Sequence, residues 1–215
     1  MLFCFEDVNA FQTKFGVPMP SNPALLSDEA YNFRVGFLKE EQQEFVDSHE
    51  KKDFEGCIDA LLDEVYVACG TSLMMGIDNT RWLMAYDKAL SSEHGDMLLN
   101  SKLQRAYEPR LLPEEDYNKA ITLMGLNLNK FIHHHYYGDI EGCTRSMSSL
   151  VSVCYSIADT MGLNWSTWRE MWDDVQRANM SKVRATDASQ SKRKTSLDVI
   201  KPPGWVGPDG GKILD

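Results

Sequence analysis

The chain has 215 residues, of which 43% are hydrophobic and 25% are charged, a composition that is typical of a folded globular protein and excludes a disordered or fibrous one. The formal net charge of −10 argues against a general nucleic-acid-binding protein, because phosphate contacts need clustered Lys and Arg. No apolar run approaches the roughly 20 residues of a membrane span, and residues 1–15 lack a signal-peptide core, so we expect a cytoplasmic protein without a membrane partner.

A repeat organises the chain, which matches itself without a gap at an offset of 86 residues. Asp53–Cys57 aligns with Asp139–Cys143, and the two segments share the pattern Asp-x-Glu-Gly-Cys. A coincidence between two amphipathic helical stretches would explain a shared periodicity but not this shared pattern. We therefore predict one all-α domain at residues 1–183, made of two tandem repeats at about 21–97 and 107–183, with an N-terminal extension at 1–20 and a tail at 184–215.

Each repeat is predicted to be helical. In the first, apolar residues recur at helical spacing in Phe37–Phe45 and again in Ile58–Val65. The polar stretch Lys51–Asp53 is a plausible turn between them, in which Asp53 is suited to cap the second helix, and Gly76 is suited to end that helix. A third helix is expected after it, and two such helical hairpins facing each other would close a four-helix bundle.

The first repeat carries a group of five acidic side chains at helical spacing: Glu40, Glu41, Glu44, Asp59 and Asp63. Glu41 and Glu44 are three residues apart and Asp59 and Asp63 are four apart, so each pair projects from one side of its helix. Glu41 also lies on the apolar stripe, where an ionised carboxylate needs a partner or a metal ion. An all-oxygen set without histidine suits Mg²⁺, or Mn²⁺ in its place.

A solvated helix face is the ordinary interpretation of such a charge run. The second repeat favours a functional interpretation instead, because at the same offset it carries Leu126, Asn127, Lys130, Arg145 and Ser149. The apolar core positions keep apolar partners while every acid is lost. This contrast predicts that the acids form one functional set, present in the first repeat only.

The pattern Glu40-Glu41-x-x-Glu44, followed by Asp63-x-x-Tyr66, resembles the EExxE…ExxD signature of the all-α NTP pyrophosphohydrolases. That superfamily includes MazG, phosphoribosyl-ATP pyrophosphohydrolase and dimeric dUTPase. Where the family often has Glu, this chain has Ala60, so Asp59 would take that role. Further segments that are similar to phage-type members lie at residues 11–16, 66–71, 178–183 and 198–205.

The resemblance implies that Asn179 and Lys182 hold the triphosphate. At the same offset these two positions align with Glu93 and Asp96, whose carboxylates would repel phosphate. Each repeat would thus keep the half of the site that the other has lost, giving one composite site in a chain that looks like a fused dimer. Two copies of such a chain could also associate as a homodimer. Trp205 follows Lys201 in the tail and is a candidate to fold over the nucleotide, although an ordinary disordered tail is an open alternative.

The resemblance implies a MazG-type bundle and a metal-dependent enzyme that converts a (d)NTP, with dGTP or GTP suggested by the phage-type segments, to (d)NMP and pyrophosphate. Glu40, Glu41 and Glu44 would be catalytic, and the five acids would bind Mg²⁺. Glu40 is a candidate general base, but the sequence leaves open which glutamate has that role. A dimeric-type dUTPase and a non-catalytic nucleotide-binding module are the alternatives.

Overall fold

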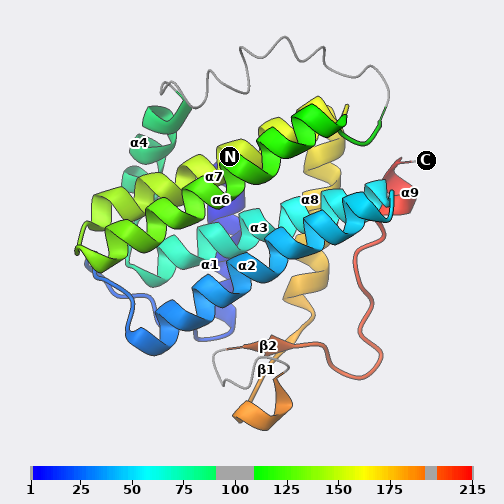
Figure 1. Ribbon diagram of the computed structural model, residues 1–215. Coiled ribbons are helices and arrows are strands. Elements are labelled where there is room, and N and C mark those ends of the chain that lie inside the picture. Colours follow the sequence, from blue (N-terminus) through cyan, green and yellow to red (C-terminus); the bar gives the residue numbers. More distant parts are fainter. Residues whose placement is uncertain (1, 91–108, 192–197, 215) are drawn as a thin grey trace.

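The computed structural model describes residues 2–90, 109–191 and 198–214, and these residues are mostly helical (Figure 1). The helices are α1 (Leu2–Lys14), α2 (Asp28–Glu50), α3 (Phe54–Met74), α4 (Asn79–Leu90), α6 (Glu114–Tyr136), α7 (Ile140–Thr160), α8 (Trp165–Met180) and the short α9 (Gly210–Leu214). A 3₁₀ turn at Ala188–Gln190 lies between strands β1 (Val183–Arg184) and β2 (Val199–Ile200), which pair antiparallel. The predicted all-α class is confirmed.

The boundaries of the first hairpin follow from local chemistry. The Ser27 hydroxyl accepts a hydrogen bond from the Ala30 amide at the start of α2, and the Asp53 carboxylate accepts one from the Gly56 amide at the start of α3. Gly76 ends this hairpin with φ of +72°, and a Cβ there would lie 2.6 Å from the Pro20 carbonyl oxygen. The predicted cap at Asp53 and the predicted end at Gly76 are therefore confirmed.

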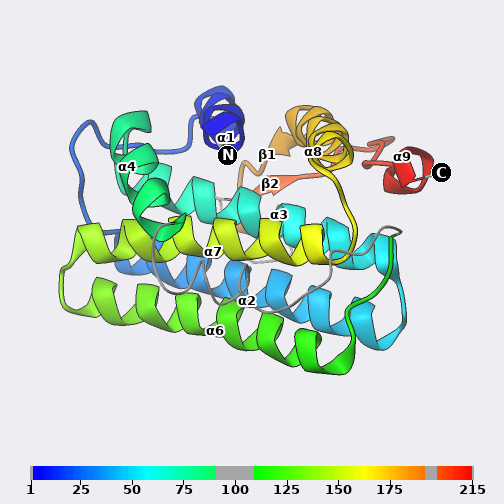
Figure 2. The same ribbon diagram turned by 90° about the horizontal axis from the view of Figure 1, so that it is seen from above.

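Two helical hairpins, α2–α3 and α6–α7, pack on each other through α3 against α7 and α2 against α6. Figure 2 shows α3 and α7 in the middle, with α2 and α6 on one side and α1, α4 and α8 on the other. Because neighbours cover α3 on both sides, almost every residue from Cys57 to Met74 is buried. The core also holds the fully buried rings of Phe5, Phe45, Trp82, Phe131, Trp168 and Trp172.

The two hairpins exchange equivalent contacts. The Tyr31 ring stacks on His135 at 4.3 Å between ring centroids, and the His49 ring stacks on Tyr117 at 4.0 Å. Tyr31 and Tyr117 are related by the 86-residue offset, and so are His49 and His135. Such reciprocal contacts are those of a two-fold interface. They agree with the predicted duplication, which stays a prediction, as do the domain boundaries.

The remaining observations concern the cysteines and two predictions about chain segments. All five cysteines are buried free thiols. In the part of the chain that the structure describes, no helix is long and apolar enough to cross a membrane. Glu93 and Asp96, which align with Asn179 and Lys182 in the repeat, lie outside the described residues.

Candidate active site

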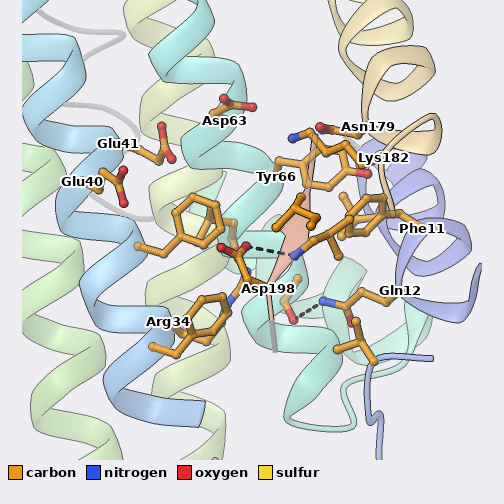
Figure 3. Close-up of a pocket in the computed structure, with 18 of the residues that line it drawn as sticks. Phe11, Gln12, Arg34, Glu40, Glu41, Asp63, Tyr66, Asn179, Lys182 and Asp198 are labelled. Carbon is orange, nitrogen blue, oxygen red and sulfur yellow. Dashed lines mark hydrogen bonds between the residues drawn. The ribbon is translucent and has the colours of Figure 1, made fainter. Parts of the chain in front are cut away.

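A cavity of about 480 Å³ opens between α1, α2, α3 and the segment that runs from the end of α8 to β2 (Figure 3). Charged and polar side chains line one part of it: Glu40, Glu41, Glu44, Asp63, Asn179, Lys182 and Lys201. Nearly all the site residues predicted from the sequence therefore face one space. Asp59 and Trp205 instead line an adjoining hollow of about 280 Å³, to which Lys201 also contributes.

Helix geometry places the acids on one side of the cavity. Glu40 and Glu41 project from α2 toward the side of α3 that carries Asp63 (Figure 3). Only 3% of Glu41 is exposed, so its carboxylate is among the most buried acidic groups described. The predicted facing of the two acidic helix sides agrees with this arrangement.

The carboxylates of α3 are crowded electrostatically. Burial and the neighbouring Asp59 carboxylate raise the pKa of Asp63 to about 7, although Lys182 acts in the opposite direction. Burial and the Glu44 carboxylate likewise raise the pKa of Asp59. Asp59 therefore interacts with the acid group although it does not line the main cavity. A cation bound here would relieve this repulsion.

The basic side of the cavity depends on the small β-sheet. The antiparallel register pairs Val183 with Ile200, so the next pair outward sets Lys182 opposite Lys201. Both ammonium groups lie over the Trp205 ring, at 5.5 Å from its centroid for Lys182 and 4.5 Å for Lys201. The Trp205 indole donates a hydrogen bond to the Ala178 carbonyl at 2.9 Å, which holds the tail against the end of α8.

The acidic side of the cavity offers donor groups for a metal ion. Among the described residues, no three His, Cys, Asp or Glu side chains already surround one point closely enough to hold an ion. The chemistry of the donors suits a hard cation, because Glu40, Glu41, Glu44 and Asp63 offer only carboxylate oxygens and repel one another. These side chains would have to turn toward a common ion to bind it.

Sequence reasoning missed Gln12, Arg34 and Asp198, which also line the cavity. The Arg34 Nε donates a hydrogen bond to the Thr71 hydroxyl at 3.0 Å, and Arg34 is 7% exposed. The Asp198 carboxylate accepts a hydrogen bond from the Ser191 hydroxyl at 2.7 Å. A signal existed for Arg34, since it lies four residues from both Ala30 and Leu38 on the apolar side of α2.

The cavity therefore combines acids on a helical hairpin with cationic side chains from a distant part of the chain. Residues 8–89 match the family model of phosphoribosyl-ATP pyrophosphohydrolase. The matched residues include α2 and α3 entirely, with all five predicted acids, so this segment is similar to the MazG-like all-α NTP pyrophosphohydrolase superfamily, as the sequence predicts. The match suggests a pyrophosphohydrolase that acts on nucleotide phosphates, a hydrolase of acid anhydrides.

The matched segment ends before Asn179, Lys182, Lys201 and Trp205, so the basic side of the cavity lies outside it. Comparisons with curated proteins and with solved structures gave no match.

Proposed function

We propose that the protein hydrolyses a (d)NTP between its α- and β-phosphates and releases a (d)NMP and pyrophosphate. One observation carries the proposal: acids from α2 and α3 share a cavity with Asn179, Lys182 and Lys201 from the end of the chain. A polyphosphate bridging the two sides would meet a cation-binding group on one side and positive charge on the other. The resemblance to phage-type members makes dGTP or GTP the substrate that we propose first.

In this proposal Glu41, Glu44 and Asp63 hold a divalent cation, with Asp59 supporting them from the adjoining hollow. Bound Mg²⁺, or Mn²⁺ in its place, would offset phosphate charge and make water a better nucleophile. Glu40 lies at the edge of the acid group and accepts the proton of the attacking water.

The basic residues would act on the substrate from the other side. Lys182 and Asn179 donate hydrogen bonds to the phosphate oxygens and stabilise the charge that develops there. Lys201 and Trp205 cover the phosphates from the tail.

The experiment is to incubate the protein with Mg²⁺ and each of dGTP, dATP, dCTP, dTTP and dUTP, and to identify the products. We expect monophosphate and pyrophosphate, and no turnover when the cation is chelated. Hydrolysis of dUTP alone would identify a dUTPase instead. Release of orthophosphate as the first product would contradict the proposal. The absence of any product would also contradict it and would favour a non-catalytic nucleotide-binding module.

The placement of the phosphates is tested with Lys182→Met, for which we expect kcat/KM to fall about 10- to 100-fold, because a hydrogen bond to a charged group is lost. Lys119→Met is the matched control, since Lys119 pairs with Glu115 on α6 and does not line the cavity. Equal activity of the two variants would show that Lys182 does not bind the phosphates.

A further inference from the structure

The cavity has a second end, which the proposed reaction does not use. Gly70 follows Asp63 by seven residues on α3, and Arg34 precedes Glu41 by seven residues on α2. Seven residues are two helical turns, or about 10 Å, which is roughly the span from the phosphate to the base of a nucleotide. Figure 3 shows Gln12 and Arg34 at the end of the cavity opposite Asp63 and Lys182.

The Gln12 amide at this end has a fixed orientation. Its Nε2 donates a hydrogen bond to the Gly70 carbonyl at 2.9 Å, so flipping the amide would set two oxygens against each other. The Oε1 acceptor has no hydrogen-bond partner among the described residues, although only 3% of Gln12 is exposed. A buried acceptor without a partner destabilises the folded protein, and a ligand with an N–H group would supply the missing hydrogen bond.

Gly70 makes this arrangement possible. A Cβ at Gly70 would lie 2.7 Å from Gln12 Nε2 and 2.8 Å from Arg34 Nη2, both too close for a real side chain. The lack of a side chain therefore lets the amide and the guanidinium approach the same point of α3. The two groups form a pair: an oriented acceptor beside a positive charge.

Aromatic rings complete this end of the cavity, which Phe11, Phe33 and Phe37 line. The Arg34 guanidinium lies 5.8 Å from the Phe33 ring centroid and 5.7 Å from that of Phe37, which helps to hold it in place. Apolar ring surfaces beside a few oriented polar groups are the usual surroundings of a bound base.

We propose that this end of the cavity binds the nucleobase and that Gln12 is a specificity-determining residue, an inference that rests on the proposed nucleotide substrate. Gln12 Oε1 accepts a hydrogen bond from a ring N–H of the base, and the Arg34 charge faces the adjacent carbonyl oxygen. Guanine, thymine and uracil present this combination of ring N–H and carbonyl. Adenine and cytosine have a ring nitrogen without hydrogen at that place.

The test measures binding of nucleoside monophosphates, so that it does not depend on turnover. For the wild-type protein we expect dGMP, dTMP or dUMP to bind at least about 10-fold more tightly than dAMP and dCMP. In Gln12→Met the difference should shrink to less than about 3-fold. Gln43→Met is the matched control, because Gln43 is exposed on α2 and lies outside the cavity, and it should keep the wild-type ranking.

Methylated bases test the same hydrogen bond without a substitution in the protein. Methylation of guanine N1, or of thymine N3, removes the ring N–H and should weaken binding to the wild-type protein about 10-fold or more. Gln12→Met should bind methylated and unmethylated bases alike. An unchanged ranking in Gln12→Met, tolerance of the methyl group by the wild-type protein, or a preference for dAMP or dCMP would each overturn the proposal.

Hydrolysis of the matching triphosphates separates this inference from the proposed function. Selective binding without pyrophosphate release would contradict the function and leave the base site standing. Pyrophosphate release with the same base ranking in Gln12→Met and wild type would contradict the base site alone.

Discussion

The two hairpins have the same architecture and different chemistry. Asp53 and Asp139 cap α3 and α7 in the same way, and both accept a hydrogen bond from the amide three residues on. Glu41 on α2 and Asn127 at the equivalent position of α6 are each 3% exposed. Asn127 satisfies its amide within its own helix by donating to the Leu123 carbonyl at 2.9 Å.

The comparison shows that the hairpin fold does not need the acids. The second hairpin builds the same buried position with a neutral side chain, which avoids the cost of desolvating a carboxylate. The first hairpin carries that cost at Glu41, Asp63 and Glu64, a pattern that is expected where a site is kept for function at the expense of stability.

The largest effect is expected at the buried acid of the first hairpin. Glu41→Gln should lower pyrophosphate release by at least about 100-fold, because losing even an indirect partner of a metal typically costs 10- to 100-fold. Melting should show an intact fold, since the second hairpin accommodates an amide at the equivalent position. The measurement is the steady-state rate with Mg²⁺.

Lys130→Gln is the matched control in the second hairpin, at the position equivalent to Glu44. It should keep activity within about 2-fold, because a site without metal or substrate contacts contributes little to catalysis. Loss of activity in both variants would contradict the assignment of the acids to one hairpin.

A second effect concerns Glu64, which is fully buried where the second hairpin has the fully buried Leu150. Burial raises the pKa of Glu64 to about 8, although a hydrogen bond from Gln42 at 2.8 Å opposes this. Between the ordinary pKa of Glu and this raised pKa, the folded protein therefore keeps the proton, whereas the unfolded chain has released it. Stability due to this group is complete below the ordinary pKa of Glu and is lost as the pH rises toward 8.

We expect Glu64→Gln to remove most of this pH dependence. The free energy of unfolding of the variant minus that of wild type should be about 3 kcal/mol larger at pH 8 than at pH 5. Denaturant unfolding across this range measures it. Glu170→Gln, at an exposed position of α8, should leave the pH profile unchanged. A wild-type profile in Glu64→Gln would show that Glu64 is ionised in the folded protein.

The smallest effect tests the equivalence of the hairpins. Tyr31→Leu and Tyr117→Leu should each lower the free energy of unfolding by about 1 kcal/mol, because each removes one stack on a histidine. The two losses should be equal within error when measured by urea unfolding. A loss at one position only would argue against a two-fold relation between the hairpins.

The helices, their caps and the common side of the acids could be predicted from the amino-acid sequence. Asp53 caps its helix through atoms three residues away, and Glu40, Glu41 and Glu44 share a cavity because helical geometry fixes their relative directions. These are local relations, which the spacing of residues along one helix contains.

The distant side chains that complete the cavity could be identified only from the packing of the helices and strands. Gln12 reaches Gly70 because α1 packs on α3, and Lys182 lies opposite Lys201 because β1 pairs with β2. Asp59, one turn before Asp63, falls into the adjoining hollow instead. Such relations depend on how helices and strands pack, which no spacing within a single segment specifies.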